Sequence, residues 1–358
     1  EPHEVERGAG AFDTGAGCQN PREVGKGPAR LLSRHKMSQS LRHILLFAAL
    51  FMALSVHAQQ TYPGRAIRIV VPFAPGGIAD FAARSVSQGL TESLSVPIVI
   101  DNRPGAGGVT GSDIVAKAAP DGYTVMITSI SHTINLSVNT TMPFDTRRDF
   151  TPVMLIADAP NFLVTHPSLP IKSVKEFIAF ARARPGQITY ASSGNGTSTH
   201  LSGELFKVLT KTDLIHVPYK GGGPAVIDLL GGHVQLMFAT MPTVMQQVKA
   251  GKLRGLAVTG ARRFASAPDF PTIAEAGVPG YAVSGWTGMF VPANTPKEIT
   301  NRLANETAKI LLAPGLKERF LAQGAEPSVK MPDEFAAFVE AEIAKWKKVV
   351  EFAGARAD

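Results

Sequence analysis

The fold of this chain is restricted above all by a unit in which a short strand, a glycine turn and a helix follow one another. Residues 67–84, IRIVVPFAPGGIADFAAR, form the first such unit. Ile67–Val71 is a β-branched run of the kind found in buried strands, and Pro72 ends it. Beyond Asp80, apolar residues recur at every fourth position, which indicates one face of a helix. The glycines either make a tight turn only or, with the helix N-terminus, form a cradle of backbone N–H groups that suits an anion.

The same order of elements continues along the chain. We expect a strand at Pro97–Ile100, a helix at Ser112–Ala119 and a strand at Tyr123–Thr128. This β-α-β-α-β succession predicts an α/β fold in which helices cover the faces of a parallel sheet. Two further strands, separated by a proline, are expected within 153–165. The apolar spacing of Pro332–Phe352 predicts a long final helix whose aromatic residues belong to the core.

Two more glycine-rich loops lie in the middle of the chain. Ser192–Ser198 follows a strand expected at Gln187–Ala191. The second of these loops, Lys220–Gly223, follows a strand expected at Leu214–Val217. Each leads into a helix, as the first loop does. Three loops with hydroxyls and small residues but one cation, Lys220, suggest that backbone N–H groups and hydroxyls recognise carboxylate oxygens.

The composition of the first loop limits how a bound charge is met. No Lys or Arg lies between Pro72 and Phe81, so backbone N–H groups and water are expected to face an anion. On this hypothesis Gly77 matters because a Cβ there would crowd a carboxylate and could forbid a positive φ. Asp80 is interpreted first as a helix cap and second as an acceptor for a hydroxyl or amino group of a ligand. His200, after the second loop, either faces a ligand or bonds to nearby backbone at the helix start.

The N-terminal segments have the pattern of sequences that are removed from a mature protein. Residues 1–36 contain no Met and no apolar periodicity, and we expect them to be a leader outside the translated protein. The segment 37–58 has a short basic stretch, the apolar run Ile44–Val56 and a small-residue cleavage site, which is typical of a secretory signal peptide. The mature chain is then expected to be 59–358. The single cysteine, Cys18, falls in the leader, so the mature chain suits an oxidising compartment.

The charge of the chain is modest and spread out. Lys and Arg number 36 against 29 Asp and Glu, which gives a formal net charge of +7. The tightest basic clusters, Arg147–Arg148, Arg262–Arg263 and Lys345–Lys348, are small and read as solvated faces. We therefore expect no nucleic-acid partner.

The motifs of common enzymes are missing from the sequence. There is no G-x-S-x-G elbow of a serine hydrolase, and no thiol remains after the expected cleavage. His132, His200, His216 and His233 lack the H-x-x-x-H spacing of a zinc site. A protein without catalytic residues, metal or cofactor is expected.

Several motifs resemble those of one family over essentially the whole chain after Ala58. They include VPFAPGGIADFAAR (71–84), IDNRPGAGG (100–108) and VPYKGGGPA (217–225). The chain resembles the Bug/TctC family, the periplasmic solute-binding proteins of tripartite tricarboxylate transporters. The resemblance implies a two-lobed type II periplasmic-binding-protein fold with a ligand cleft between the lobes. The implied lobes are 59–160 with 281–358, and 161–280.

The resemblance also implies a set of ligand-binding residues. In the family a carboxylate meets the backbone of the first loop, and its far end meets loops of the second lobe. Carried over to this sequence, the implied residues are Phe73, Ala74, Gly76, Gly77, Asp80, Ser129 and His132 on one lobe, and Ser193, Gly194, Thr197, His200, Tyr219 and Lys220 on the other. Many family members carry a polar or acidic residue where this chain has Ala239–Met241, which leaves room for a bulkier or partly apolar carboxylate.

The implied function is capture of a small carboxylate, such as a di- or tricarboxylate, in the periplasm by a monomeric receptor. The receptor would deliver this ligand to the permease subunits of a tripartite transporter. A ligand sensor that docks a signalling partner is the alternative, because it needs the same closing clamp. The sequence leaves both open.

Overall fold

The computed structural model describes residues 62–139 and 141–354, together with Gln39 and His43. The leader and signal peptide expected at 1–36 and 37–58 lie outside the described residues, apart from these two positions. No helix in the described part of the chain combines the length and the apolar character needed to cross a membrane.

The strands alternate with helices from the start of the described chain, as the glycine-turn units predict. The strands are β1 (Ile67–Val71), β2 (Ile98–Asn102), β3 (Thr124–Ser129), β4 (Phe150–Thr165), β5 (Ile188–Ser192), β6 (Leu214–Pro218), β7 (Leu236–Thr240), β8 (Arg254–Val258), β9 (Ser284–Pro292) and β10 (Glu326–Lys330). The helices are α2 (Ile78–Leu94), α3 (Val109–Ala116), α4 (Ser131–Val138), α5 (Val174–Arg182), α6 (Ser198–Thr210), α7 (Gly222–Leu230), α8 (Met241–Lys249), α9 (Lys297–Leu312), α10 (Pro314–Ala322) and α11 (Pro332–Ala353), with a short 3-10 turn η1 (Ala106–Gly108).

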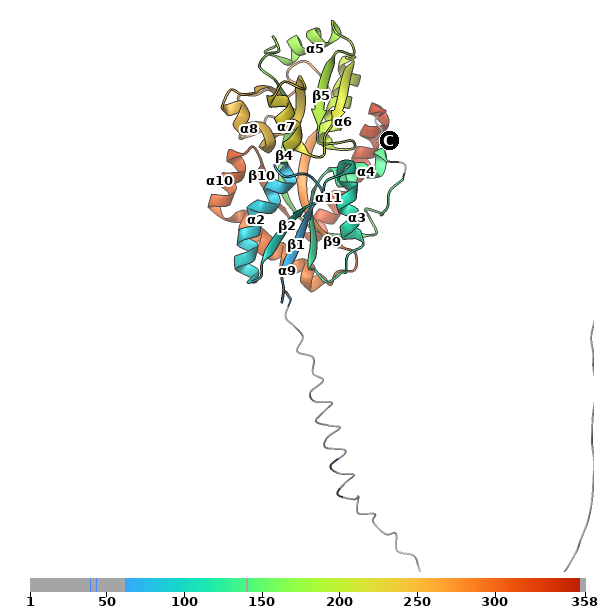
Figure 1. The fold of residues 1–358 in the computed structure, drawn as a ribbon, viewed down its shortest axis with the longest axis vertical. Helices are drawn as coiled ribbons and strands as arrows, with labels where there is room; N and C mark the ends of the chain where they lie inside the picture. The colour runs from blue at the N-terminus through green and yellow to red at the C-terminus, as the bar shows by residue number, and fades with distance from the viewer. Residues whose placement is uncertain (1–38, 40–42, 44–61, 140, 355–358) are drawn as a thin grey trace, which may run out of the picture. The chain divides into compact units, whose positions relative to one another are not determined.

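The strands of the described residues join into one sheet in the order β2-β1-β3-β9-β4-β7-β5-β6, with β8 and β10 also paired to β4. Strand β1 lies parallel to β2 and β3, and β5 lies parallel to β6 and β7. These two parallel sets are the α/β arrangement that the succession of elements predicts. In Figure 1 one set, with α2, α3 and α9, lies below, and the other, with α5 to α8, lies above.

Strand β4 connects the two sets because it changes partner along its length. From Phe150 to Pro160 it pairs antiparallel with β9, and from Asn161 onward it pairs with β7. The expectation of two separate strands was wrong, since β4 is continuous through Pro160. Proline lacks the N–H of a sheet ladder, and Pro160 is tolerated because it lies where one pairing ends and the other begins.

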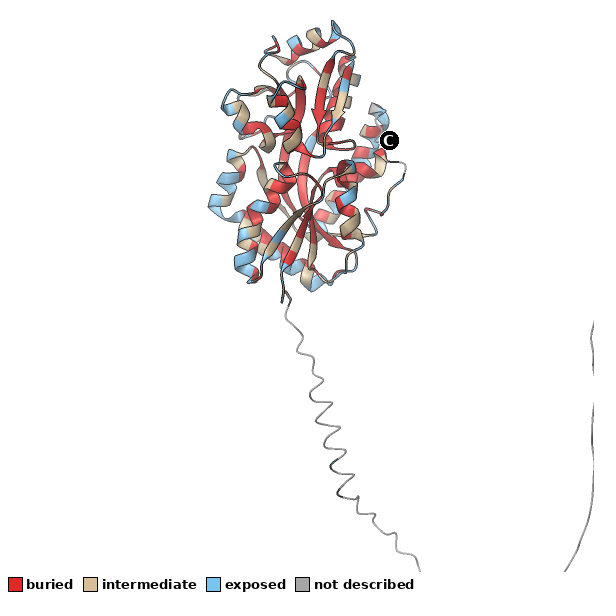
Figure 2. Ribbon diagram, viewed as in Figure 1, coloured by how far each residue is buried: buried red, intermediate tan, exposed pale blue. Residues whose placement is uncertain are grey.

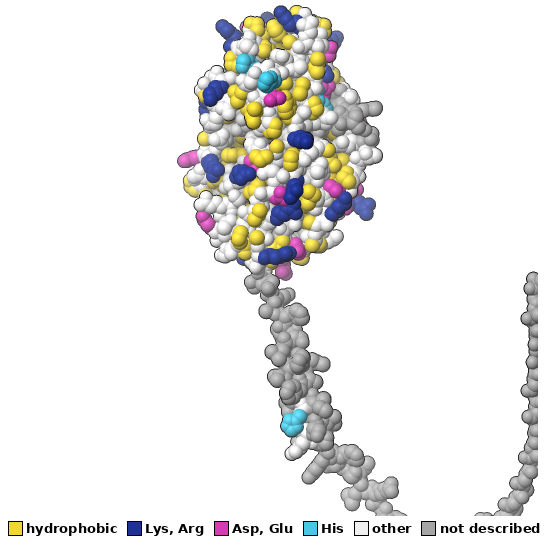
Figure 3. Space-filling model, viewed as in Figure 1, with side chains coloured by type: hydrophobic (Ala, Val, Ile, Leu, Met, Phe, Trp, Pro, Cys, Tyr) yellow, Lys and Arg dark blue, Asp and Glu magenta, His cyan; other side chains and the backbone are white. Residues whose placement is uncertain are grey.

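In the described residues one apolar cluster packs on the first set of strands, one packs on the second, and a third runs continuously across both sets. Figure 2 shows that buried residues follow the strands and the helix faces turned toward them. Large fully buried side chains include Phe162, Tyr190 and Phe238 around the second set, and Phe335 and Trp346 on α11. The expected long final helix is confirmed, and Phe335 and Trp346 lie in the core, whereas Phe338 is partly buried and Phe352 is exposed. Charged side chains on the face in Figure 3 are scattered, with both signs interspersed.

Candidate functional site

A pocket of about 340 Å³ lies where the glycine-rich loops of the two parallel sets meet. We call it the central pocket. Its lining is formed by Phe73, Gly77, Ile78, Ala79, Ser129, Ser131, Ser193, Thr197, Ser198, Thr199, Gly222 and Thr240.

Five helices begin at the central pocket. Ile78 opens α2 and Ser131 opens α4 on the side of β1 to β3. On the side of β5 to β7, Ser198 opens α6, Gly222 opens α7 and Thr240 immediately precedes α8. The first backbone N–H groups of a helix have no partner within it, and the helix dipole adds a partial positive charge there. The pocket therefore presents donors and positive potential from several directions.

Side chains leave most of these helix ends uncapped. No side-chain cap is found at the start of α2, α4, α7 or α8, all of which lie in the described part of the chain. Only α6 has a side-chain cap among the five, because Thr197 Oγ1 accepts the N–H of His200 at 3.3 Å. Orphan N–H groups are thus left for water or a ligand.

Hydroxyl groups in the lining add further hydrogen-bond donors to the central pocket. The pocket includes the hydroxyls of Ser193 and Ser198, which have no hydrogen bond within the described residues. The hydroxyls of Ser129 and Ser131 pair with each other at 3.1 Å. None of the described lining residues carries a charged side chain. The pocket can therefore meet an anion with neutral donors and helix dipoles, without a salt bridge.

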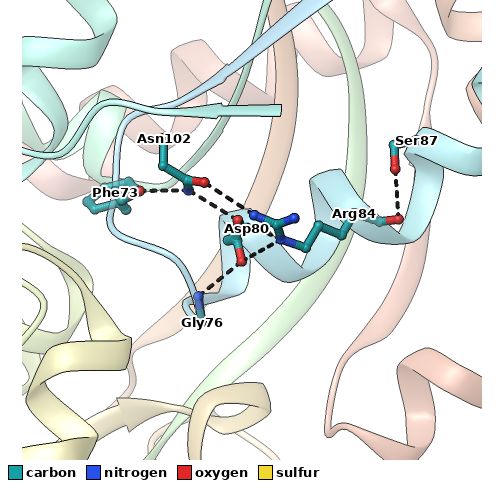
Figure 4. A network of polar contacts seen from close by, with 6 residues as sticks. All are labelled: Phe73, Gly76, Asp80, Arg84, Ser87 and Asn102. Atoms are coloured by element: carbon teal, nitrogen blue, oxygen red, sulfur yellow. Dashed lines mark hydrogen bonds and ion pairs between the residues drawn. The ribbon is translucent and has the colours of Figure 1, made fainter. Parts of the chain in front are cut away.

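The first glycine loop is held in place by a polar network behind the pocket (Figure 4). Asp80 accepts the N–H of Gly76 at 3.0 Å and the guanidinium of Arg84 at 3.0 Å. Asn102 donates to the Phe73 carbonyl at 2.9 Å and to Asp80 at 3.1 Å. Asn102 is the last residue of β2, in the IDNRPG motif, so the second strand anchors the loop that follows the first.

Asp80 thus acts from behind the loop. Burial of Asp80 raises the pKa of its carboxyl, but hydrogen bonds from Arg84, Gly76 and Asn102 outweigh burial and hold that pKa below its usual value. The carboxylate stays ionised and is occupied by these three partners. The helix itself begins at Ile78, with Gly77 as its N-cap. Asp80 therefore binds backbone in the first turn, close to the capping interpretation, and does not line the central pocket.

The conformational argument for Gly77 was wrong. Gly77 has an extended backbone with φ −89°, which any residue adopts. The positive φ of this loop, +85°, belongs to Gly76. A Cβ on Gly77 would meet only ordinary contacts, 3.7 Å from the N atom of Gly222. Gly77 therefore matters only because a side chain there would enter the pocket.

The second glycine loop is held by hydrogen bonds of its own. Thr197 Oγ1 donates to the Gly194 carbonyl at 2.7 Å, and Thr199 Oγ1 accepts the N–H of Ser193 at 2.8 Å. His200 accepts the N–H of Gly196 through Nδ1 at 3.2 Å. His200 is therefore bonded to nearby backbone, one of the two alternatives that the sequence left open, and it does not line the central pocket.

A stack of aromatic rings is hydrogen-bonded to this loop. The rings of His200 and His216 lie 4.2 Å apart and nearly parallel, and Tyr190 stacks on the other face of His216 at 4.8 Å. Burial lowers the pKa of His200 to about 4 and that of His216 to about 3. His216 Nε2 lies 2.6 Å from the hydroxyl of Ser192, which is fully buried and also accepts the N–H of Gly194. This serine–histidine pair is buried, and its hydrogen bonds stabilise the second glycine loop.

His132 lies in an aromatic cluster away from the pocket. Its ring is 4.6 Å from Phe150 and 4.9 Å from Phe290. Neither ring nitrogen has a hydrogen-bond partner in the described residues, and burial lowers the pKa to about 3. His132 was expected in a loop after β3, but it lies on α4, whose packing turns the ring into the core.

A second cavity, of about 590 Å³, opens beside the central pocket. We call it the rim cavity. Its lining is formed by Ala106, Gly107, Asn139, Gly194, Asn195, Pro218, Tyr219 and Lys220. The Tyr219 hydroxyl donates to Asp228 at 2.6 Å, whereas the exposed Lys220 ammonium forms no ion pair within the described residues. Lys220 is the cation of the rim cavity.

The sequence-based site residues therefore fall into three groups. The central pocket brings together Phe73, Gly77, Ser129, Ser193 and Thr197. The rim cavity includes Gly194, Tyr219 and Lys220. Outside both linings lie Ala74, Gly76, Asp80, His132 and His200. Sequence reasoning missed Ile78, Ala79, Ser131, Ser198, Thr199, Gly222 and Thr240. For Ser198 and Gly222 the available signal was their place at the first residue of a helix that follows a glycine loop.

Metal ligands do not gather anywhere in the described ranges, where no group of three His, Cys, Asp or Glu side chains has suitable geometry. This mixed α/β sheet with one partner-switching strand matches the fold of known periplasmic binding proteins. The chain belongs to the TctC family, the tripartite tricarboxylate transporter family receptors, whose pattern matches residues 82–355.

Known proteins support this assignment over nearly their whole length. Protein BugT of Bordetella pertussis is 38% identical over 322 residues, which covers 89% of this chain and 99% of BugT. The solved structure of R. palustris Rpa4515 with adipate is 41% identical, with a TM-score of 0.80, and covers 82% of this chain and 99% of that chain. MatC (Rpa3494) from Rhodopseudomonas palustris with bound malate is 32% identical, with a TM-score of 0.77, and covers 81% of this chain and 100% of that chain. The related proteins are periplasmic binding proteins, and this chain is a solute-binding receptor of their family.

Proposed function

We propose that the chain captures a small dicarboxylate in the central pocket and delivers it to the permease subunits of a tripartite tricarboxylate transporter, without catalysing a reaction. The observation that carries the proposal is the convergence of five helix N-termini on a pocket whose described lining has hydroxyls but no charged side chain. Each N-terminus favours an anion by about 0.3–1 kcal/mol, and by more where water is excluded.

The distribution of donors favours a ligand with two anionic ends. Helices α2 and α4 approach from one parallel set of strands, and α6, α7 and α8 approach from the other. A carboxylate at each end of a short chain can then be met by a separate group of N–H donors. Adipate in Rpa4515 and malate in MatC are ligands of this kind in related structures.

Binding from two sides implies two lobes that move relative to each other. The proposed lobes are 59–160 with 281–358, and 161–280. Strand β4 supports this division because it exchanges β9 for β7 between Pro160 and Asn161. The proposed hinge is this exchange together with the segment that precedes β9.

A thermal-shift screen followed by calorimetry tests the choice of ligand. The panel contains adipate, malate, citrate, a monocarboxylate, an amino acid and the uncharged diamide of adipate. A ligand at one hundred times its dissociation constant adds about 2.7 kcal/mol to the free energy of unfolding, so binding raises the melting temperature visibly. Dicarboxylates are expected to stabilise the protein, whereas the uncharged diamide is expected to leave its melting temperature unchanged. Equal stabilisation by the diamide would overturn recognition of the charge.

Delivery to a permease is tested separately. Membrane vesicles that carry the two permease subunits of a tripartite tricarboxylate transporter from the same genome are supplied with labelled dicarboxylate, with and without the protein. Uptake that depends on the protein supports transport. Binding without any stimulated uptake, together with capture of a sensor protein, would support the signalling alternative.

A further inference from the structure

The two sides of the central pocket touch each other through glycine residues. Gly223, at the start of α7, packs against the backbone of Pro75 and Gly76 in the first loop. Gly107, in η1, packs against the carbonyl of Asn195 and lies beside Gly194 in the second loop. We call these contacts the glycine seam. It joins residues of the two proposed lobes on either side of the cavities.

The seam leaves no room for side chains. A Cβ on Gly223 would overlap the carbonyl oxygen of Pro75, and one on Gly107 would overlap the carbonyl oxygen of Asn195. Backbone atoms cannot rotate away as the end of a flexible side chain can. Glycine is therefore the residue that allows the two backbones to approach this closely.

A direct hydrogen bond joins the first and third glycine loops beside the glycine seam. The N–H of Ala74 donates to the carbonyl of Lys220 at 3.0 Å, and Gly221 lies against Ala74. The bond can form only when the first and third loops are in contact. The central pocket, lined by Gly77 and Gly222, lies directly beside this contact. Its walls are therefore at their present separation only while the seam is closed.

We infer that Gly107 and Gly223 are positioning residues that set how far the cleft closes, and hence how tightly a carboxylate is held, without touching the ligand themselves. The inference rests on the proposed function. A methyl group at the seam would hold the two loops apart. Donors on opposite walls would then lie beyond hydrogen-bonding distance of one ligand, since such bonds weaken steeply past about 3.2 Å.

Gly223→Ala tests the inference with little change to its own lobe. Gly223 is in the helical region, so alanine fits its backbone conformation. Gly315→Ala is the matched control, because Gly315 also lies in a helix and a Cβ there meets nothing within 4 Å. Adipate and malate are the probes, measured by calorimetry and by stopped-flow binding. We expect a dissociation constant about tenfold higher or more for Gly223→Ala, mainly through faster release, and no change for the control.

Gly107→Asn is the second variant, since Gly107 has φ +60° and asparagine accepts that conformation better than alanine. Its matched control is Gly251→Asn, at φ +69° with open space around the Cβ. Weaker binding in Gly107→Asn but not in Gly251→Asn is expected. X-ray scattering with saturating probe should give a larger radius of gyration for both seam variants than for both controls.

Three results would count against the inference. Binding by Gly223→Ala and Gly107→Asn equal to that of their controls would overturn it while leaving the proposed function intact. A fall in the melting temperature of the ligand-free variants that accounts for the lost affinity would also overturn it, because the seam would then be part of the resting fold. Failure of the unmodified protein to bind either acid would overturn the proposed function and the inference together.

Discussion

Two hydroxyls of the central pocket, those of Ser193 and Ser198, have no hydrogen bond within the described part of the chain. A polar group that is left without a protein partner beside a cavity gains more from a ligand than one already bonded. Their contribution to binding can therefore be separated from their contribution to the fold.

Replacing either hydroxyl is expected to weaken dicarboxylate binding with little effect on the fold. Ser193→Ala and Ser198→Ala each remove one donor, and a lost hydrogen bond to a charged group costs about 1.5–3 kcal/mol. Calorimetric titration with adipate measures the loss, and thermal unfolding of the ligand-free protein should be unchanged. Ser202→Ala is the control, because Ser202 Oγ is buried and bonded to Asn161 and to the Ser198 carbonyl. It should lower the melting temperature and leave affinity nearly unchanged.

The buried His132 predicts that the folded protein loses stability in acid. Its pKa is about 3 in the folded protein, against about 6.5 in an unfolded chain. As the pH falls below about 6.5, the unfolded chain takes up a proton that the folded protein refuses, so the free energy of unfolding drops. The free energy of unfolding stops falling only when the pH approaches the pKa of His132 in the folded protein.

His132→Phe removes this loss while keeping a ring among Phe144, Phe150 and Phe290. The variant is expected to be more stable by about 1 kcal/mol at pH 7, since no unpartnered ring nitrogen remains buried. The advantage should widen by about 1.4 kcal/mol per pH unit below 6.5. Urea unfolding at pH 7, 6 and 5 measures it. A difference that stays constant with pH would contradict the assignment of a neutral buried imidazole.

At the scale of elements, the first loop and helix α2 depend on strand β2 through Asn102 and Asp80. Phe73 is the one large apolar side chain that the loop buries, and Pro75 is exposed, so polar contacts fix much of the shape of the loop. This dependence can be broken without touching the pocket.

Asp80→Ala is expected to loosen the first loop. It leaves the N–H of Gly76 and one bond of Asn102 unmet, which costs about 1–3 kcal/mol of stability. Affinity for adipate should also fall, because the α2 N-terminus is less well positioned. Asp80→Asn keeps an acceptor for Gly76 and should lose less in both measurements. Equal effects of the two variants would show that the Arg84 ion pair, and not the loop contact, is what matters.

Local signals explain which elements could be predicted. The units around β1 and α2, β5 and α6, and β6 and α7 follow from β-branched runs and glycine turns, which act over a few residues. Helices α4 and α8 were missed because they are short and begin directly after a strand without a side-chain cap. The continuity of β4 depends on two different partners far along the chain, and no pattern within 150–165 reveals it.

The site was only partly predictable for a related reason. A loop can be placed from sequence, but the direction of a side chain on the following helix depends on tertiary packing. His132 and His200 therefore turned into the interior, while Ser131 and Ser198 turned to the pocket. Asp80 lies in the first turn of α2, where its carboxylate points back to the loop.

At the scale of the whole molecule, the one cation of the rim cavity stands outside the central pocket. Lys220 is exposed and without an ion pair in the described residues, so its field extends into the solvent around the rim cavity. Charges so placed speed the arrival of an oppositely charged ligand more than they hold it.

Lys220→Gln is accordingly expected to slow association of adipate severalfold at low ionic strength and to leave dissociation nearly unchanged. The difference should shrink as salt rises to 0.5 M, because the screening length falls to a few ångströms. Lys252→Gln, an exposed lysine beyond α8, serves as the control. Stopped-flow measurement of both rate constants decides the matter. A faster dissociation for Lys220→Gln, unaffected by salt, would instead mean that the ammonium contacts the bound ligand.

The absence of charged side chains from the described pocket lining has a consequence for what a partner would meet. A receptor that pairs its ligand with arginines has a positively charged site when it is empty. The bound anion brings the charge of that site close to zero. Here dipoles screen the anion but cancel none of its formal charge. A dicarboxylate bound in this pocket would make the filled protein more negative than the empty one by the whole charge of the ligand, so a docking partner could distinguish the two by charge as well as by shape.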